Sequence, residues 1–168
     1  LNFKDIKQLK SYNKKKSFFV AVTVNPDNAF IKDVILNNFD YIQLHGSESK
    51  ERVEEIKTKG IKIIKTIKVR DESDIDNYKQ YDNADIILFD TPGMEKSIQF
   101  PVKLISKIPK GDRFGLAGSI NQNNIENIVN SGVGFCDLSS SLELDKQIGY
   151  KDHQKIKSFM KKINELKN

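Results

Sequence analysis

The sequence contains little of several residue types that mark particular protein classes. It has a single cysteine, Cys136, which excludes a disulfide framework and favours a reducing, cytoplasmic location. No apolar run approaches the length of a membrane span, and no signal peptide is visible. Four prolines and nine glycines are spread over 168 residues, so no stretch has the composition of a linker. We therefore expect one soluble domain over residues 1–168.

Arginine is also scarce, although the chain is basic. Lysine and arginine total 28 against 23 acidic residues, a net charge of +5, and only Arg52, Arg70 and Arg113 are arginines. The lysines are scattered over every segment, whereas surfaces that bind nucleic acid usually cluster their charge and favour arginine. We expect neither nucleic acid nor a membrane as a partner, and a modest attraction for anionic small molecules.

Six short β-branched runs alternate with amphipathic segments along the chain. The runs begin about 21 to 28 residues apart, which suits a strand, a loop, a helix of about ten residues and a second loop. Such alternation predicts an α/β fold with a parallel sheet and right-handed crossovers. The runs are 17–24, 40–44, 61–69, 85–90, 113–117 and 134–138.

Polar residues between these runs predict where the helices begin. Phe3, Ile6 and Leu9 predict a leading helix, and a last helix is expected from about Lys151. The start signals of the intervening helices lie at 26–27, 47–48, 71–73 and 121.

Six βα units are compatible with two architectures. An eight-stranded (βα)8 TIM barrel needs about two more strands, so the chain would then hold strands 3 to 8 of an incomplete barrel. The alternative is an open, doubly wound sheet of six strands. The chain starts at Leu1 without a methionine, and on the barrel interpretation we expect that its N-terminal part is missing from the sequence.

Two consecutive runs end in turns of small residues, at 115–121 and 137–143. Such turns let backbone N–H groups point at a phosphate, and the following helix N-terminus adds partial positive charge. A pair of these turns is the usual phosphate site of a βα-barrel, after its seventh and eighth strands. We predict phosphate binding at Gly118, Ser119, Ser139 and Ser140.

Six short motifs resemble those of one family, phosphoribosylanthranilate isomerase, and occur in the same order. The most specific is Tyr-Ile-Gln-Leu-His-Gly at 41–46, which is similar to the family's Val-Gln-Leu-His-Gly. Leu-Phe-Asp-Thr at 88–91 resembles its sixth-strand Leu-Leu-Asp-Thr. The other four motifs are 20–25, 116–121, 137–143 and 149–152.

The resemblance implies a βα-barrel enzyme of tryptophan biosynthesis that needs no cofactor and no metal. The implied reaction is the Amadori rearrangement of N-(5-phosphoribosyl)anthranilate to 1-(2-carboxyphenylamino)-1-deoxyribulose 5-phosphate. Asp90 matches the family's general acid, and Gln43, His45 and Asp137 match positions near the substrate. Gln43 and His45 are two residues apart and should point to the same side of a strand. For Asp90, His45 and Asp137, a structural role in a loop or cap is the alternative.

The sequence also departs from the family pattern. The family's base is a cysteine in a Lys-x-Cys-Gly segment, which is absent here together with a Ser-Pro-Arg loop. Cys136 should face away from the side of its neighbour Asp137 and cannot replace that base. The glycine-rich loop after the sixth strand is reduced at 92–97, which puts loop closure in doubt. Serine replaces glycine at Ser119 and Ser141, which would strain any backbone of positive φ.

Three interpretations follow. We favour an isomerase whose sequence is truncated, so that activity is impaired in the 168-residue chain, stability is low and the chain is a monomer or a homodimer. The second is a non-catalytic sugar-phosphate-binding protein derived from the same family. The third is an unrelated phosphate-binding enzyme with Lys65 as a Schiff-base lysine. An exposed or snorkelling side chain is the commoner situation for a lysine and is the alternative for Lys65.

Overall fold

A computed structural model describes residues 3–11, 15–91 and 100–167. Within these ranges, six parallel strands form one sheet, and each lies in or overlaps one of the six predicted runs. The register pairs each strand with the next along the chain, for example Val22 with Gln43 and Ile67 with Phe89. The strands are β1 (Val20–Thr23), β2 (Tyr41–Leu44), β3 (Lys62–Lys68), β4 (Ile86–Asp90), β5 (Gly111–Leu116) and β6 (Val133–Cys136).

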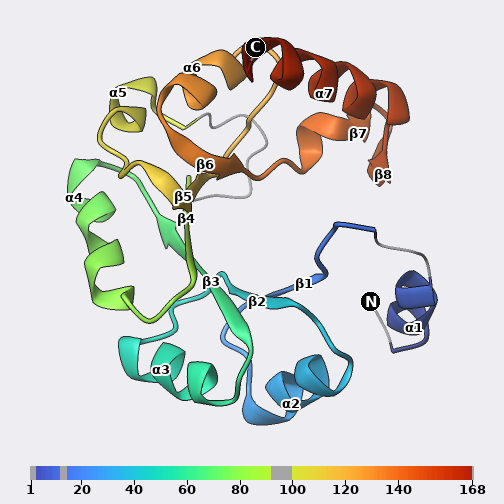
Figure 1. Cartoon of the computed structure of the whole chain (residues 1–168), viewed down its shortest axis with the longest axis vertical. Helices are drawn as coiled ribbons and strands as arrows, with labels where there is room; N and C mark the ends of the chain where they lie inside the picture. Colours follow the sequence, from blue (N-terminus) through green and yellow to red (C-terminus); the bar gives the residue numbers. More distant parts are fainter. Residues whose placement is uncertain (1–2, 12–14, 92–99, 168) are drawn as a thin grey trace.

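The strand order decides between the two predicted architectures. A doubly wound sheet reverses its strand order and carries helices on both faces. Here the order runs from β1 to β6 without reversal, and the sheet curves into an arc with its helices outside (Figure 1). The βα-barrel prediction is therefore confirmed, and β1 and β6 are the two ends of the sheet in the described part of the chain.

Helices or helical turns follow the first five strands, and α7 closes the chain. Asp27 caps α2 by accepting a hydrogen bond from the Phe30 N–H, as its position predicts. Asp71 and Asp74 form a capping box at α4. The helices are α1 (Phe3–Ser11), α2 (Asn28–Leu36), α3 (Lys50–Thr58), α4 (Glu72–Ile75), η1 (Asp76–Tyr81), α5 (Val102–Ile105), α6 (Ile125–Asn130) and α7 (His153–Lys167). None of these described helices is both long and apolar enough to cross a membrane.

Two predicted helix starts were wrong. The cap of α3 is Ser49, whose side chain accepts from the Arg52 N–H, so the helix begins later than the signal at 47–48. The signal at Asn121 marks a turn that precedes α6, because its side chain accepts from the Asn123 N–H. Both errors arise because several polar residues in a row can act as a cap, and tertiary contacts select one of them.

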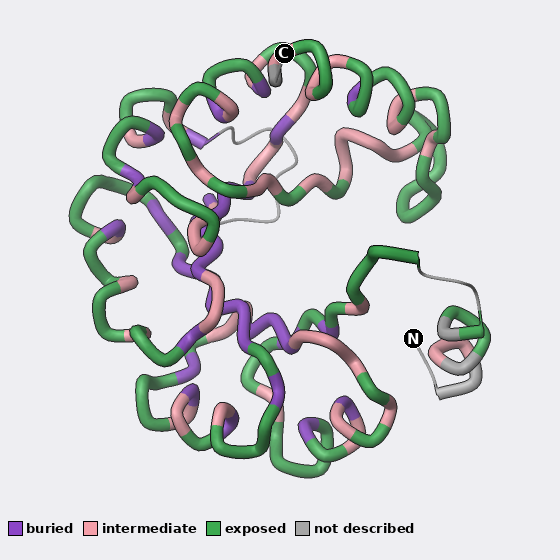
Figure 2. Tube along the Cα trace, viewed as in Figure 1, coloured by how far each residue is buried: buried purple, intermediate pink, exposed green. Residues whose placement is uncertain are grey.

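The hydrophobic core lies between the outer face of the sheet and the helices (Figure 2). Ile42, Ile63 and Phe89 point outward from their strands and are fully buried there. The inner face carries a smaller cluster of Ile64, Leu88 and Ala117. A strand buried on both faces reads as a continuous apolar run, which is why β3 and β4 were easy to recognise in the sequence.

Lys65 is neither exposed nor snorkelling, and this part of the sequence interpretation was wrong. Its side chain leaves β3 on the outer face, is 2% exposed and pairs with Glu48, which is 1% exposed. The ammonium lies 2.7 Å from a carboxylate oxygen of Glu48. Because the side chain is absent from the lining of the pocket described below, the chain does not use Lys65 as a Schiff-base lysine there.

A two-stranded antiparallel hairpin follows β6 and was not predicted. It consists of β7 (Glu143–Leu144) and β8 (Gln147–Lys151), after the short helix η2 (Ser140–Leu142). Because Lys151 belongs to β8, the last helix begins at His153, slightly later than predicted. The Lys151 ammonium donates to the Ser139 carbonyl at 2.8 Å and so ties the hairpin to the turn after β6.

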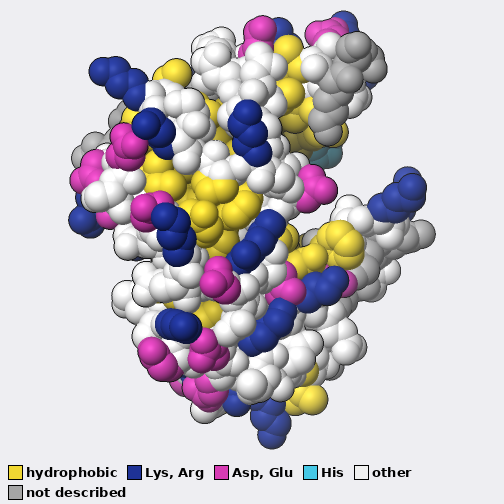
Figure 3. All heavy atoms as spheres, turned by 60° about the vertical axis from the view of Figure 1, so that its left-hand side comes forward, with side chains coloured by type: hydrophobic (Ala, Val, Ile, Leu, Met, Phe, Trp, Pro, Cys, Tyr) yellow, Lys and Arg dark blue, Asp and Glu magenta, His cyan; other side chains and the backbone are white. Residues whose placement is uncertain are grey.

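Charges of both signs are mixed on the outside of the molecule. On the face in Figure 3, Lys and Arg side chains lie among Asp and Glu side chains over the helices. One such pair joins Lys57 of α3 to Asp85, just before β4, with 2.5 Å between ammonium and carboxylate. The same Asp85 oxygen accepts from the Ile63 N–H at 2.7 Å, so this carboxylate links α3, β3 and β4.

Asp85 makes the stability of the fold sensitive to acid. Burial would raise its pKa, but the hydrogen bonds from Lys57 and Ile63 and the charge of Lys57 outweigh burial and hold the pKa below its ordinary 3.8. A carboxyl with a lowered folded pKa contributes stability above its unfolded pKa and loses it as the pH falls through the folded value. We predict that Asp85→Asn lowers the melting temperature at neutral pH, and that variant and wild type converge as the pH falls through the lowered pKa of Asp85. A pH-independent difference would contradict this account.

Candidate active site

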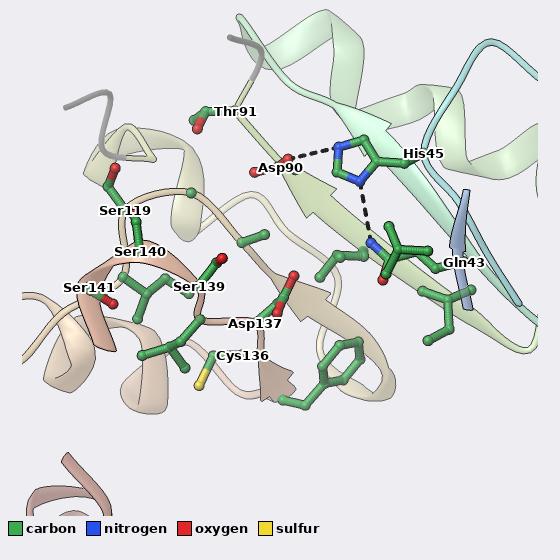
Figure 4. Close-up of a pocket in the computed structure, with 18 of the residues that line it drawn as sticks. Gln43, His45, Asp90, Thr91, Ser119, Cys136, Asp137, Ser139, Ser140 and Ser141 are labelled. Carbon is green, nitrogen blue, oxygen red and sulfur yellow. Dashed lines mark hydrogen bonds and ion pairs between the residues drawn. The ribbon is translucent and has the colours of Figure 1, made fainter. Parts of the chain in front are cut away.

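A pocket of about 810 Å³ opens at the carboxyl ends of the strands. All eight residues predicted from the sequence to touch substrate or phosphate line it, and they come from or follow four strands (Figure 4). They are Gln43, His45, Asp90, Gly118, Ser119, Asp137, Ser139 and Ser140. The carboxyl ends of parallel strands share one rim, which explains how residues nearly a hundred positions apart converge.

His45 and Asp90 are in direct contact across the mouth of the sheet. The His45 Nε2 atom lies 3.2 Å from an oxygen of Asp90, and the two side chains are 29% and 17% exposed. On the other side of the ring, Nδ1 lies 3.4 Å from the side-chain nitrogen of Gln43, which only donates. With the Gln43 amide in this orientation, Nδ1 accepts and the neutral ring carries its proton on Nε2, directed at Asp90.

Gln43 and His45 point to the same side of β2, as their spacing predicts (Figure 4). Gln43 is buried, and its amide also donates to the Thr66 hydroxyl of β3 at 3.2 Å. Gln43 thus contacts Nδ1 of the imidazole, and Asp90 contacts Nε2 from across the pocket. Thr66, Gln43, His45 and Asp90 thus form a chain of four side chains from β3 through β2 to β4.

Asp137 is the carboxyl of the pocket whose pKa is raised. Desolvation by the surrounding protein is the main cause, although the residue is open to the pocket, and Asp90 adds to it when ionised, against the opposing effects of His45 and Lys151. Its backbone N–H donates to the Leu116 carbonyl at 2.8 Å, so the residue continues the pairing of β6 with β5. A carboxyl in this environment holds its proton to a higher pH than an aspartate surrounded by water alone.

The first phosphate turn depends on one glycine. Gly118 has φ +98°, and a Cβ atom placed on it would lie 2.4 Å from the Thr91 hydroxyl. Ser119 follows with φ +46°, so the strain expected from serine at this position is present. The side-chain amides of Asn121 and Asn124 both donate to the Ser119 carbonyl, at 3.0 and 3.1 Å, and hold the turn in this shape.

The second turn differs from expectation at Ser141. This serine has no positive φ, so the replacement of glycine strains no left-handed backbone there. Its hydroxyl is instead buried with no hydrogen-bond partner in the described part of the chain, which is unfavourable for a polar group. The serine therefore affects the turn through its side chain, whereas Ser119 affects the first turn through its backbone.

Two residues that line the pocket received no role from the sequence. Thr91 follows Asp90 directly and packs against Gly118. Lys151 lies in β8, and its ammonium also contacts a carboxylate oxygen of Glu143 at 3.2 Å. Both occur inside motifs that carry the family resemblance, which is the signal that could have identified them.

The Cys136 sulfur points to the side opposite the Asp137 carboxyl, as predicted from their neighbouring positions, although the residue contributes to the lining of the pocket (Figure 4). Its side chain packs against the core between the sheet and the helices. In the described ranges, no group of three or more His, Cys, Asp or Glu residues is placed to hold a metal ion. The reduced glycine loop at 92–97 lies outside the described residues.

The chain was compared with known proteins and structures. The family model of N-(5'-phosphoribosyl)anthranilate isomerase matches residues 2–162. The N-(5'-phosphoribosyl)anthranilate isomerase of Aquifex aeolicus is 34% identical over 171 residues, covering 94% of this chain and 76% of the relative. That of Agrobacterium fabrum is 32% identical over 157 residues, covering 87% and 70%.

A solved structure shows the same fold. It is a phosphoribosyl anthranilate isomerase in complex with reduced 1-(o-carboxyphenylamino)-1-deoxyribulose 5-phosphate. It aligns with a TM-score of 0.78 at 25% identity, and the alignment covers 98% of this chain and 80% of that one. The two chains therefore share the fold over nearly the whole of this chain.

The contact between Gly118 and Thr91 gives a testable prediction with a matched control. Gly118→Ala should destabilise the chain by about 1 to 3 kcal/mol more than Gly111→Ala, because both positions have positive φ but only the first meets another side chain. Gly118→Ala should also weaken the binding of inorganic phosphate. Urea unfolding and calorimetric titration measure the two effects, and equal losses in both variants would refute the steric argument.

Proposed function

The chain belongs to the N-(5'-phosphoribosyl)anthranilate isomerase family and is an isomerase of tryptophan biosynthesis, and we propose that its pocket performs the Amadori rearrangement with Asp90 as general acid. The observation that carries the proposal is the convergence of the eight predicted residues in one pocket. Acid, imidazole and both small-residue turns face the same space, which is large enough for a sugar phosphate with an aromatic substituent.

Asp90 would begin the reaction. Its carboxyl would protonate the ring oxygen of the phosphoribosyl group as the C1–O bond breaks. The nitrogen lone pair then forms the C1=N bond of an open-chain Schiff base, and the aspartate is left ionised. His45, with Nε2 at 3.2 Å, would hold that carboxylate in place and stabilise its charge.

The second step removes the proton from C2 of the Schiff base. The electrons of the C–H bond then form the C1=C2 bond while the C1=N π electrons return to the nitrogen. The resulting enol loses its hydroxyl proton as C1 takes up a proton, which gives the ketone, so C2 is oxidised and C1 is reduced within one molecule. The family assigns the C2 proton to a cysteine in a segment that the sequence of 168 residues lacks, and Cys136 faces the core. We therefore expect the chain by itself to turn over slowly.

Asp137 would bind the anthranilate carboxylate. Two ionised carboxylates repel each other, but desolvation and the neighbouring Asp90 raise the pKa of Asp137, which favours its protonated form. A protonated carboxyl donates a hydrogen bond to a carboxylate. The raised pKa therefore suits Asp137 to recognition of the anionic ring.

The two turns would hold the phosphate mainly through backbone N–H groups. Gly118 and Ser119 form one side, and Ser139 and Ser140 form the other. Lys151 adds a positive charge beside the second turn, since its ammonium lies 2.8 Å from the Ser139 carbonyl. We place the reaction in the cytoplasm, with a small-molecule phosphoribosyl substrate and the chain as a monomer or homodimer.

Asp90→Asn tests the role of the acid. The variant should lower kcat by about a hundredfold or more, because a positioned proton transfer is lost while the shape of the side chain is kept. Turnover is measured by the loss of substrate fluorescence, for the 168-residue chain and for the chain with any residues encoded before Leu1. Asp112→Asn, at an exposed position at the start of β5, is the matched control and should leave kcat unchanged.

Two results would overturn this assignment. If Asp90→Asn keeps its kcat, another group is the acid. If neither form of the chain turns over substrate while both bind phosphate, the non-catalytic sugar-phosphate-binding alternative replaces the isomerase. Binding of the reduced product analogue should survive in Asp90→Asn, which separates loss of chemistry from loss of the pocket.

Asp137 is tested by a pair of variants and by pH. Asp137→Asn should keep KM within about threefold of wild type, because the amide still donates a hydrogen bond, whereas Asp137→Ala should raise KM by about tenfold. As the pH rises through the raised pKa of Asp137, the wild-type KM should increase and that of Asp137→Asn should not. The same pH dependence in both proteins would contradict a protonated Asp137 in binding.

A further inference from the structure

We propose that the buried ion pair between Lys65 and Glu48 is a positioning device that fixes the loop after β2 and so keeps His45 against Asp90. The inference rests on the proposed function, because it gives these residues a part in the same reaction. Neither side chain touches the pocket, so both act through the loop 45–48.

Lys65 reaches the loop from β3. Its ammonium, 2% exposed, donates to a carboxylate oxygen of Glu48 at 2.7 Å, to the Gly46 carbonyl at 3.0 Å and to the Leu44 carbonyl at 3.3 Å. Three acceptors match the three N–H donors of an ammonium group. The Tyr81 ring, with its centroid 5.4 Å from the same nitrogen, covers the remaining side.

Glu48 holds the loop from the other direction. One of its oxygens accepts from the Gly46 N–H at 3.1 Å and from the Asn25 N–H at 2.8 Å. Asn25 follows β1, and its side-chain oxygen in turn accepts from the Ser47 N–H at 2.9 Å. The carboxylate therefore ties the loop after β2 to the loop after β1 as well as to β3.

His45 lies between the two residues whose carbonyls accept from Lys65. With Leu44 and Gly46 both bound to that ammonium, the peptide groups on either side of His45 are fixed. The His45 N–H itself donates to the Thr23 carbonyl at 2.9 Å. The direction of the imidazole toward Asp90 is thus set by the backbone around it, and that backbone is set by the ion pair.

There is little room for the loop to move. A Cβ atom on Gly46 would lie 2.4 Å from the Asn25 side-chain oxygen and 2.7 Å from a Glu48 oxygen. The loop therefore packs directly on the polar groups that hold it. A shift of the Glu48 carboxylate must therefore move Gly46, and with it the preceding residue, His45.

A purely structural role makes a different prediction. Buried ion pairs contribute little net stability, and replacing both partners by apolar side chains of similar size is often neutral. If Lys65 and Glu48 only filled the core, such a replacement would leave catalysis intact. If they position His45, the replacement preserves the fold and lowers kcat.

The test compares two double variants that both remove the ion pair. Glu48→Met with Lys65→Met removes every hydrogen bond that these two side chains make to the backbone of the loop. Glu48→Gln with Lys65→Met keeps an oxygen that can accept from the Gly46 and Asn25 N–H groups. We expect the first to lower kcat by about tenfold or more with KM within about twofold, and the second to recover most of kcat. Lys57→Met removes a different ion pair, at the far end of the strands, and should lower the melting temperature without changing kcat.

A second measurement does not depend on turnover. In the chain as it exists, amide hydrogen exchange should show Gly46 and Ser47 protected, with protection lost in the double methionine variant and kept in the glutamine variant. Unchanged protection together with unchanged kcat in the double methionine variant would overturn the inference. If neither the 168-residue chain nor the chain with residues encoded before Leu1 turns over substrate, the proposed function fails, and the exchange pattern still decides whether the ion pair holds the loop.

Gly46→Ala provides the same test if the double methionine variant does not fold. Its added methyl group displaces Glu48 and Asn25 while both charges remain. We expect the same loss of kcat and of Ser47 protection. Full activity and protection in Gly46→Ala would show that the loop tolerates displacement, and would also overturn the inference.

Discussion

The alternation of side chains across a single curved parallel sheet determines the rest of this structure. Along each strand, successive residues point to the helices and to the interior of the arc in turn. Ile63 and Phe89 therefore enter the core, and Ile64 and Leu88 form the inner cluster. Because all six strands run the same way, the inward residues at their carboxyl ends meet at one rim, and the pocket is the result.

The two aspartates at that rim, Asp90 and Asp137, lie in different electrostatic surroundings. Asp90 contacts an imidazole, whereas Asp137 lies open to the pocket, partly desolvated by the protein around it and with Asp90 as a negative neighbour when Asp90 is ionised. The environment thus distinguishes two side chains of identical chemistry and suits them to different tasks, as in other enzymes with paired carboxyls. Lys151 extends the same principle to the phosphate end, where a positive charge lies beside a turn of small residues.

Local pattern predicted the parts of the fold that depend on local chemistry. The six strands follow from apolar runs, the cap at Asp27 from its side chain, and the shared direction of Gln43 and His45 from their spacing. The burial of Lys65 could not be predicted, because it depends on Glu48 in another unit of the fold. The hairpin β7–β8 was missed because β7 has only two residues and every residue of β8 is exposed, so no buried apolar face marks it in the sequence.

Each strand of the sheet pairs with the strand of the next unit along the chain. The contacts that close the sheet thus join segments a few tens of residues apart, so the loops that must close are short for a parallel sheet. A chain with this topology can add one βα unit at a time to those already folded, in the order in which a ribosome makes them. The unreversed strand order that places the pocket also supplies a folding route that proceeds from the N-terminus.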